Sequence, residues 1–308
     1  MRVLITGSSG FTGTFLTQYL APKKNVELYG MVHTRREKRV KGIDLIPCDL
    51  RDSEKTRQVI HEVVPDAIIH LAGLTHGPLN DLLQTNVLGT DNLLRAAREL
   101  RNPCRVLVIG SSAEYGYSEP SLIPESACPN PVGDYGISKV SQTVLALKYH
   151  RQSGLQVAVV RPFNLIGPGQ APSFVCGQII SQIVAIERGQ REALDLREVT
   201  SRRDFIDVRD AVTAYWSLVH HKKFSTDCSG RIFNVGSGKS YSITDVLEII
   251  GELLSRRFPV NLPDVPEKIL VPDQQSDNAS IMAATGWRPR IGLNESLADM
   301  LDAARKFH

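Results

Sequence analysis

The first residues of the chain combine a short apolar run, a glycine-rich turn and a helical pattern in immediate succession. Residues 2–6 predict a buried β-strand, and 15–20 have the apolar spacing of a helix. Between them stands Gly7-Ser8-Ser9-Gly10-Phe11-Thr12-Gly13. Glycines at such a turn let the backbone approach a pyrophosphate closely, while the helix N-terminus supplies amide donors. A glycine turn without a ligand is the alternative, but the flanking strand and helix favour a dinucleotide-binding βα unit.

Strands and helices alternate through the first half of the chain, which is typical of an α/β fold with a Rossmann-type, doubly wound parallel sheet. Predicted strands lie at 26–32, 45–47, 67–73, 105–109 and 156–161, and predicted helices at 53–63, 82–100 and 134–151. Proline and glycine crowd residues 161–170, where a smaller domain is expected to begin. We expect 1–162 to form the dinucleotide-binding domain, with residues 202–208 returning to its sheet and a returning segment at about 205–236. Residues 163–204 and 237–308 then form a smaller mixed α/β substrate domain.

The overall composition narrows the function classes. Of 308 residues, 42% are hydrophobic and 22% charged, and a net charge of +3 is too slight to indicate a nucleic-acid or membrane-surface partner. The five cysteines are widely spaced, which argues against a disulfide framework or a metal site and favours a reducing compartment. No stretch approaches the length of a membrane span. We therefore expect a cytoplasmic protein.

The end of the second predicted strand bears on the cofactor. An NAD-specific site would have an acidic residue about twenty positions after the glycines, for the ribose 2′-hydroxyl. Here the strand runs into His33-Thr34-Arg35-Arg36, and the forked donors of arginine suit a 2′-phosphate. This favours NADP(H) over NAD(H), although a solvated basic loop is the alternative. Asp49, just beyond the third strand, is placed to accept from an adenine amino group.

Tyr135 and Lys139 are four residues apart in a helical pattern, so they lie on one face. A neighbouring ammonium is expected to lower the pKa of the phenol, which could then exchange protons with a carbonyl or an alcohol. Ser111 follows the fifth strand, at the sheet edge where ligands bind. By chance alone this spacing more often reflects a core tyrosine and a solvated lysine. His70 is interpreted as a core histidine.

Together these motifs resemble the extended short-chain dehydrogenase/reductases that act on sugar nucleotides, the NAD-dependent epimerase/dehydratase family. The markers are Gly7-x-x-Gly10-x-x-Gly13, Asp49-Leu50, His70-Leu-Ala-Gly73, Asn86-x-x-Gly89-Thr90, Ser111 before Tyr115-Gly116, Tyr135-x-x-x-Lys139 and Arg161-Pro-Phe-Asn164. The resemblance implies that Tyr135 is the acid/base, that Lys139 holds the nicotinamide ribose, and that Ser111 bonds the substrate oxygen.

The resemblance also implies two sets of binding residues. The cofactor set is Gly7, Ser9, Gly10, Phe11, Thr12, Gly13, His33, Arg35, Arg36, Asp49, Leu50, Leu71, Ala72, Gly73, Asn86, Tyr135, Lys139 and Pro162. The substrate set is Thr75, Ser111, Ser112, Asn164, Gln170 and Arg203, with Arg203 a candidate for the diphosphate. For Arg203 the alternative is a surface salt bridge with Asp204 or Asp207. The family further implies a homodimer through the 82–100 and 135–151 helices.

Within the family, Gly167-Pro-Gly-Gln170, residues 203–210 and Thr285-Gly-Trp287 most resemble GDP-4-keto-6-deoxy-D-mannose reductases, which make GDP-D-rhamnose. Dehydratases carry an acid where this chain has Ala113, and Glu114 in an extended strand would point to the opposite face. That leaves an NADPH-dependent 4-ketoreductase, an NAD-bound 4-epimerase or, from another class, a dinucleotide-sensing regulator. Related reductases have Arg-Pro where this chain has Val271-Pro272, so Arg257 or Lys268 could contact the nucleotide instead.

Overall fold

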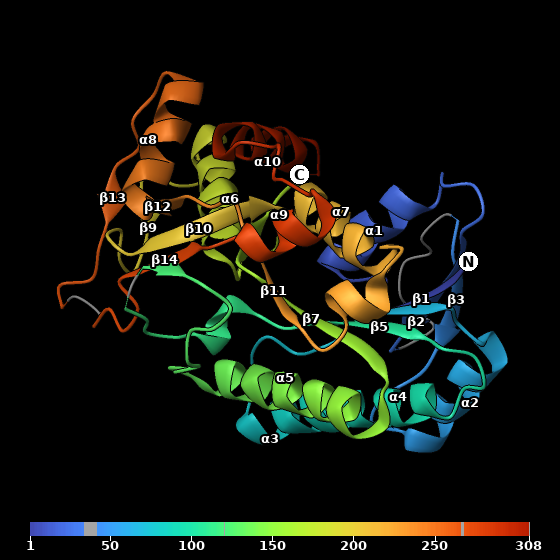
Figure 1. The fold of residues 1–308 in the computed structure, drawn as a ribbon. Helices are drawn as coiled ribbons and strands as arrows, with labels where there is room; N and C mark the ends of the chain where they lie inside the picture. Colours follow the sequence, from blue (N-terminus) through green and yellow to red (C-terminus); the bar gives the residue numbers. More distant parts are fainter. Residues whose placement is uncertain (34–41, 120, 266–267, 308) are drawn as a thin grey trace.

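A seven-stranded parallel sheet forms the centre of the computed structural model, which describes residues 1–33, 42–119, 121–265 and 268–307 (Figure 1). The strands follow the order β3-β2-β1-β4-β5-β7-β11. They are β1 (Arg2–Thr6), β2 (Glu27–Val32), β3 (Asp44–Pro47), β4 (Ala67–His70), β5 (Arg105–Ile109), β7 (Gln156–Pro162) and β11 (Ile232–Val235). The order reverses between β1 and β4, and ligands of such sheets bind outside the strand carboxyl ends at this point.

Helices cover both faces of this sheet, which explains why its central strands are apolar on both sides. One face packs against α1 (Phe11–Leu20) and α7 (Val208–Val219), and the other against α2 (Ser53–Val63), α4 (Gly89–Arg98) and α5 (Asp134–Ser153) (Figure 1). The predicted doubly wound Rossmann-type fold is confirmed by this arrangement.

The single helix expected over 82–100 is divided in the structure. It consists of α3 (Leu79–Leu82), a π-helical stretch η1 (Leu83–Leu88) and α4. Asn86 in η1 accepts a hydrogen bond from the backbone N–H of Leu74 (2.8 Å) and donates to the carbonyl of Leu74 (2.9 Å). Local widening of a helix of this kind is common near functional sites. Here it carries the side chain that holds the loop after β4, a tertiary contact that the apolar spacing could not reveal.

A second sheet has the order β12-β10-β14-β6, with β8 paired to β10. Helices α6, α8 and α10 share an apolar cluster with it (Figure 1). The elements are β6 (Leu122–Ile123), β8 (Asn164–Ile166), α6 (Val175–Glu187), β10 (Arg202–Asp207), β12 (Ser240–Ser242), α8 (Ile243–Leu254), β14 (Asp273–Ser276) and α10 (Leu293–Phe307). Smaller elements are η2 (Ser112–Glu114), the β9–β13 pair (Leu194–Asp195, Val260–Asn261), η3 (Phe224–Cys228) and α9 (Ala279–Thr285).

The expectation that residues 202–208 return to the first sheet is wrong. β10 pairs with β8, β12 and β14, so it lies in the second sheet, and only α7 and β11 return. Asp204 of β10 is fully buried and accepts hydrogen bonds from the backbone and hydroxyl of Ser237, the backbone of Gly238, and the backbone and hydroxyl of Ser276. These bonds attach β10 to β14 and to the loop after β11. The domain boundaries expected from the sequence remain a prediction.

Within the described parts of the chain, every helix falls short of the length and apolarity that crossing a bilayer demands.

Candidate active site

A cavity of about 730 Å³ lies where the two sheets meet, at the carboxyl ends of β1, β4, β5 and β7. β10 and β14 of the second sheet contribute Arg203, Phe205 and Gln274 to it. Sixteen of the residues proposed from the sequence line this cavity: Gly7, Gly10, Phe11, Thr12, Gly13, Leu71, Gly73, Thr75, Ser111, Ser112, Tyr135, Lys139, Pro162, Asn164, Gln170 and Arg203. The fold therefore brings the glycine turn, the Tyr–Lys pair and Arg203 to one space.

The glycine turn at the carboxyl end of β1 has little room for side chains. Gly7 has a φ of +67°, in the left-handed region that favours glycine. A Cβ on Gly13 would lie 2.2 Å from the carbonyl oxygen of Gly7. Gly10 precedes α1, and no side chain caps that helix. The first amides of α1 therefore face the cavity end where a pyrophosphate would fit.

Three side chains with acid–base and hydrogen-bonding chemistry meet in the same cavity. Ser111 follows β5 and caps η2, where its hydroxyl oxygen accepts from the backbone N–H of Ala113 at 3.1 Å. Tyr135 stands in the first turn of α5, and its phenol is near enough to Ser111 for that side chain to lower the pKa of the phenol. Lys139, one turn later, is buried. The predicted Ser–Tyr–Lys constellation is thus assembled from a strand end and a helix.

The expected effect of Lys139 on Tyr135 is not what the structure shows. Burial raises the pKa of Tyr135, opposed by its hydrogen bond with Ser111 and reinforced by the nearby charge of Glu114. Lys139 directs its ammonium elsewhere, to the carbonyl of Ile109 and to Gln142, each at 2.5 Å. Burial lowers the pKa of Lys139 to about 8. Tyr135 is therefore a protonated phenol at neutral pH, the state from which a proton can be donated.

A buried chain of polar contacts extends from Lys139 to β1. Gln142 donates to the hydroxyl of Thr90 at 2.8 Å, and His70 bonds to Thr90 at 2.9 Å and to Thr6 at 2.7 Å. Burial lowers the pKa of His70 to about 3, so this histidine is neutral. His70 is therefore a core histidine, as interpreted from the sequence.

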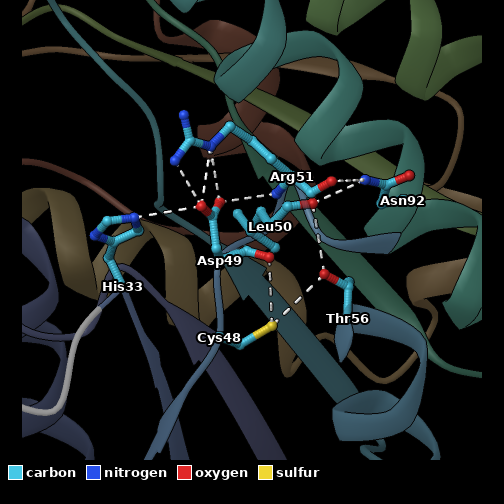
Figure 2. A network of polar contacts seen from close by, with 7 residues as sticks. All are labelled: His33, Cys48, Asp49, Leu50, Arg51, Thr56 and Asn92. Carbon is cyan, nitrogen blue, oxygen red and sulfur yellow. Dashed lines mark hydrogen bonds and ion pairs between the residues drawn. The ribbon is translucent and has the colours of Figure 1, made fainter. Parts of the chain in front are cut away.

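Asp49 lies in a polar network beyond the end of β3 and away from the cavity lining (Figure 2). Its two carboxylate oxygens accept from the guanidinium of Arg51, at 2.6 to 3.0 Å, and His33 Nε2 lies 3.4 Å from it. These hydrogen bonds lower the pKa of Asp49 to about 2. Figure 2 also shows Asn92 donating to the backbone carbonyl of Leu50. Asp49 thus has protein partners already, and its contact with adenine stays a prediction.

Several proposed cofactor residues are not part of the cavity lining: Ser9, His33, Asp49, Leu50, Ala72 and Asn86. Asn86 is fully buried and uses its amide on Leu74 and on the hydroxyl of Ser138, so it supports the loop after β4 from behind. Arg35 and Arg36, on which the NADP(H) expectation rests, lie outside the described residues.

Residues of the second sheet, which come later in the chain than the glycine turn, line another part of the cavity. Side chains alternate along β10, so Arg203 and Phe205 face the cavity while Arg202 bonds Asp245. Arg203 does not pair with Asp204 or Asp207; it donates to the carbonyls of Arg202 and Val271, at 2.8 and 2.9 Å, and burial lowers its pKa. Lys139 and Arg203 are the charged side chains among the described residues lining the cavity, and no described Asp or Glu lines it.

Gln274 and Phe174 line the cavity but were missed from the sequence. Gln274 donates to the carbonyl of Gly116 at 2.9 Å, across the two sheets, and no local pattern points to such a contact. Val271 also lines the cavity, whereas Arg257 and Lys268 do not. Gln170 bonds to the backbones of Leu165 and Gly177, so its amide also shapes the loop before α6.

Glu114 was expected in an extended strand, and this is wrong because residues 112–114 form the short helix η2. Its carboxylate is nevertheless out of reach of the cavity. It is fully buried and paired with Arg161 at 2.8 Å. With Ala113 at the position where dehydratases carry an acid, the described lining has no carboxyl group to expel water from a sugar.

Comparison with known proteins places this geometry in a family. The model of the NAD dependent epimerase/dehydratase family matches residues 3–236. GDP-6-deoxy-D-mannose reductase from Pseudomonas aeruginosa is 32% identical over 97% of this chain and 96% of its own. GDP-6-deoxy-D-talose 4-dehydrogenase from Aggregatibacter actinomycetemcomitans is 30% identical, over 84% and 82%. The structure of RMD from P. aeruginosa complexed with NADPH superimposes with a TM-score of 0.85, at 30% identity, over 100% and 99% of the two chains. The family match, the relatives and the shared fold agree with the motifs, and the chain belongs to the NAD-dependent epimerase/dehydratase family of extended short-chain dehydrogenases/reductases.

Proposed function

We propose that this protein reduces the C4 ketone of a nucleotide-diphosphate 4-keto-6-deoxy-sugar with NADPH. The substrate that we put first is GDP-4-keto-6-deoxy-D-mannose, which would give GDP-D-rhamnose. The observation that carries the proposal is the single cavity shared by the glycine turn, the Ser111–Tyr135–Lys139 group and Arg203. The protein is an NAD(P)-dependent oxidoreductase, and the proposal concerns which substrate and which cofactor it uses.

The residues of the cavity fit a nicotinamide dinucleotide. The left-handed conformation of Gly7 and the absence of room at Gly13 leave the backbone bare at the N-terminus of α1, where a pyrophosphate is held by amides and the helix dipole. Leu71 and Gly73 after β4 and Pro162 at the end of β7 continue this side of the cavity. When bound there, the cofactor supplies the hydride that reduction of a ketone requires.

Tyr135 and Ser111 account for the proton and the orientation of the substrate. Both residues line the same cavity and the Ser111 side chain influences the pKa of Tyr135, so both hydroxyl groups are placed to reach one ketone oxygen. Because burial keeps Tyr135 protonated, it is suited to donate its proton to that oxygen as negative charge develops there. Lys139, whose pKa is about 8, is mostly a cation at neutral pH and is placed to hold a ribose hydroxyl beside them.

The charge of the cavity supports an anionic substrate. Lys139 and Arg203 contribute positive charge, and none of the described lining residues contributes a negative one. The guanidinium of Arg203 uses one nitrogen for two backbone carbonyls, and its other donors suit a diphosphate. Val271 lies at the same end as a small apolar surface. The base of the nucleotide and the identity of the sugar are the most specific parts of the proposal.

The choice of NADPH rests on two observations outside the described cavity. Arg35 and Arg36 follow β2, where a 2′-phosphate would be recognised, and a relative with 30% identity has been solved with NADPH. We further propose a homodimer through residues 82–100 and 135–151, which contain η1, α4 and most of α5. Leu88, Ile137 and Val144 are 48%, 41% and 56% exposed on these elements, an apolar surface that a second copy would cover.

The decisive experiment incubates the purified protein with NADPH and a panel of 4-keto-6-deoxy sugar nucleotides, with the product identified by NMR. We expect consumption of NADPH and a product reduced at C4. Tyr135→Phe should abolish turnover, while Tyr117→Phe should retain it because Tyr117 is exposed and the hydroxyl that it loses bonds Glu119 at the surface. Tightly held NAD with interconversion of two sugar nucleotides would contradict the proposal in favour of an epimerase. Dinucleotide binding without any turnover would indicate a regulator.

A further inference from the structure

We propose that Glu114, paired with Arg161, is a positioning residue that sets the place of Ser111 and holds a negative charge beneath the active site. The proposal rests on the proposed function, because Ser111 and Lys139 are the groups through which Glu114 acts. Glu114 itself does not line the cavity and does not touch the substrate.

The two carboxylate oxygens of Glu114 have separate partners. Oε1 accepts from the backbone N–H of Ser111 at 3.0 Å, while Ser111 caps η2 in return through its hydroxyl. Oε2 accepts from Arg161 Nε at 2.8 Å, and Nη2 lies at the same distance. One oxygen therefore defines the backbone that carries the Ser111 hydroxyl, and the other is tied to the end of β7.

Arg161 is also held in place by the aromatic ring of Tyr115. Its guanidinium carbon lies 4.6 Å from the centroid of the Tyr115 ring, and the Tyr115 hydroxyl donates to Asn234 of β11 at 2.7 Å. A Cβ on Gly110 would lie 2.4 Å from Oε1 of Glu114, so glycine leaves the room that the carboxylate occupies beneath the active site. Glu114 is thus held between Ser111 after β5 and Arg161 of β7, and Arg161 packs on Tyr115, which is bonded to β11.

The charge of Glu114 acts on both titrating groups of the site. The groups that face it are Arg161, Lys139, Tyr135 and Tyr115. Glu114 raises the pKa of Lys139 against the larger lowering by burial, and it adds to the rise in the pKa of Tyr135. Loss of the Glu114 charge therefore lowers both pKa values. Loss of the neighbouring Arg161 charge acts in the opposite direction and makes the change smaller.

Two substitutions separate the two roles of Glu114. Glu114→Gln keeps an oxygen for Ser111 but removes the charge, so the alkaline limb of the pH profile of kcat should move down by about one pH unit. Glu114→Asp keeps the charge but is one methylene short of Ser111, so kcat should fall about tenfold at every pH with the limb in place. The same pH series is measured for NADPH binding, because Lys139 is expected to hold the nicotinamide ribose whether or not a sugar is present.

Glu114→Gln leaves Arg161 as a buried cation without a partner, which can prevent folding. The double variant Glu114→Gln/Arg161→Met removes both charges and is expected to move the limb in the same direction but by less, because loss of the Arg161 cation opposes the effect. Tyr115→Phe is the matched control: it loses the bond to Asn234 in the same buried cluster and should lower the melting temperature without moving the limb. If the double variant titrates like the wild type and Glu114→Asp keeps the wild-type kcat, the proposal is overturned. A wild-type protein that binds NADPH but reduces no keto-sugar defeats the proposed function instead, and the binding series still tests Glu114.

Discussion

The ammonium of Lys139 donates a hydrogen bond to the side-chain oxygen of Gln142, 2.5 Å away and one turn farther along α5. Gln142 is fully buried, and its side-chain amide donates a hydrogen bond to the hydroxyl of Thr90. A buried cation has few ways to be satisfied, so this contact and the one to Ile109 decide where the ammonium points. Four expectations follow from this and from other contacts of the site.

Gln142→Leu should release Lys139 from one of its two partners and leave the site less ordered. We expect the unfolding free energy to fall by about 2 kcal/mol, because a buried donor and acceptor lose their partners. Turnover should fall on the order of tenfold through misplacement of Lys139. Gln182→Leu is the control: Gln182 is a buried glutamine of α6 that bonds only Asp195 among the described residues, far from Lys139 in the fold. Its variant should lose stability and keep turnover. Equal losses of turnover in both variants would contradict a specific role of Gln142.

Lys139 should give the protein an unusual alkaline stability. Its pKa is about 8 in the folded chain, against 10.5 for an ordinary lysine. Between these pH values the unfolded chain binds more protons than the folded one, so the unfolding free energy rises with pH by up to about 3 kcal/mol from this group. Urea unfolding without cofactor measures this. Lys139→Met should remove the rise, whereas Lys148→Met, at an exposed position on the same helix, should preserve it. A wild-type slope in Lys139→Met would show that the ammonium is not desolvated.

Gly13→Ala should disrupt the turn that is proposed to bind the pyrophosphate. The added Cβ would lie 2.2 Å from the carbonyl oxygen of Gly7, and the backbone must move apart to admit it. We expect a loss of about 2 kcal/mol in stability and a marked loss of NADPH affinity, measured by fluorescence titration. Gly251→Ala in α8, whose Cβ would approach only the carbonyl of Arg256 at 3.3 Å, should bind NADPH like the wild type. Unchanged affinity in Gly13→Ala would exclude this turn as the dinucleotide site.

Asp49 should contribute stability that disappears in acid. Its hydrogen bonds with Arg51 lower its pKa to about 2, below that of an aspartate in the unfolded chain, so the contribution is complete above pH 4 and is lost as pH falls toward 2. The side chain is 33% exposed, so solvent screening reduces the effect to about 1 kcal/mol. Urea unfolding of Asp49→Asn between pH 2 and 5 should therefore show a shallower decline than the wild type. Glu54→Gln breaks an exposed pair with Arg57 and should leave the decline nearly unchanged.

Local patterns in the chain were enough to predict the first sheet, because its strands are short apolar runs and its turns are marked by glycine. They also brought out Ser111, Tyr135 and Lys139, since a helix places residues four apart on one face and a parallel sheet collects ligands at its carboxyl edge. What they could not supply was the partner of each charge. Lys139 donates hydrogen bonds to Gln142 and Ile109 instead of Tyr135, and Asp49 accepts them from Arg51. The reason is that a charge taken out of water is stabilised by whichever hydrogen-bond partner the packed chain places nearest.

Contacts between distant segments account for the remaining differences. β10 joined the second sheet because its neighbours β8, β12 and β14 come from three separate parts of the chain, which a strand's own residues do not specify. Gln274 enters the cavity, and Glu114 meets Arg161 across 47 positions, for the same reason. Periodicity and spacing describe how residues within one segment are placed relative to one another. The sequence alone therefore determined the helices, the strands and the candidate reactive side chains. The electrostatic state of those side chains was decided only when folding buried them beside partners from elsewhere in the chain.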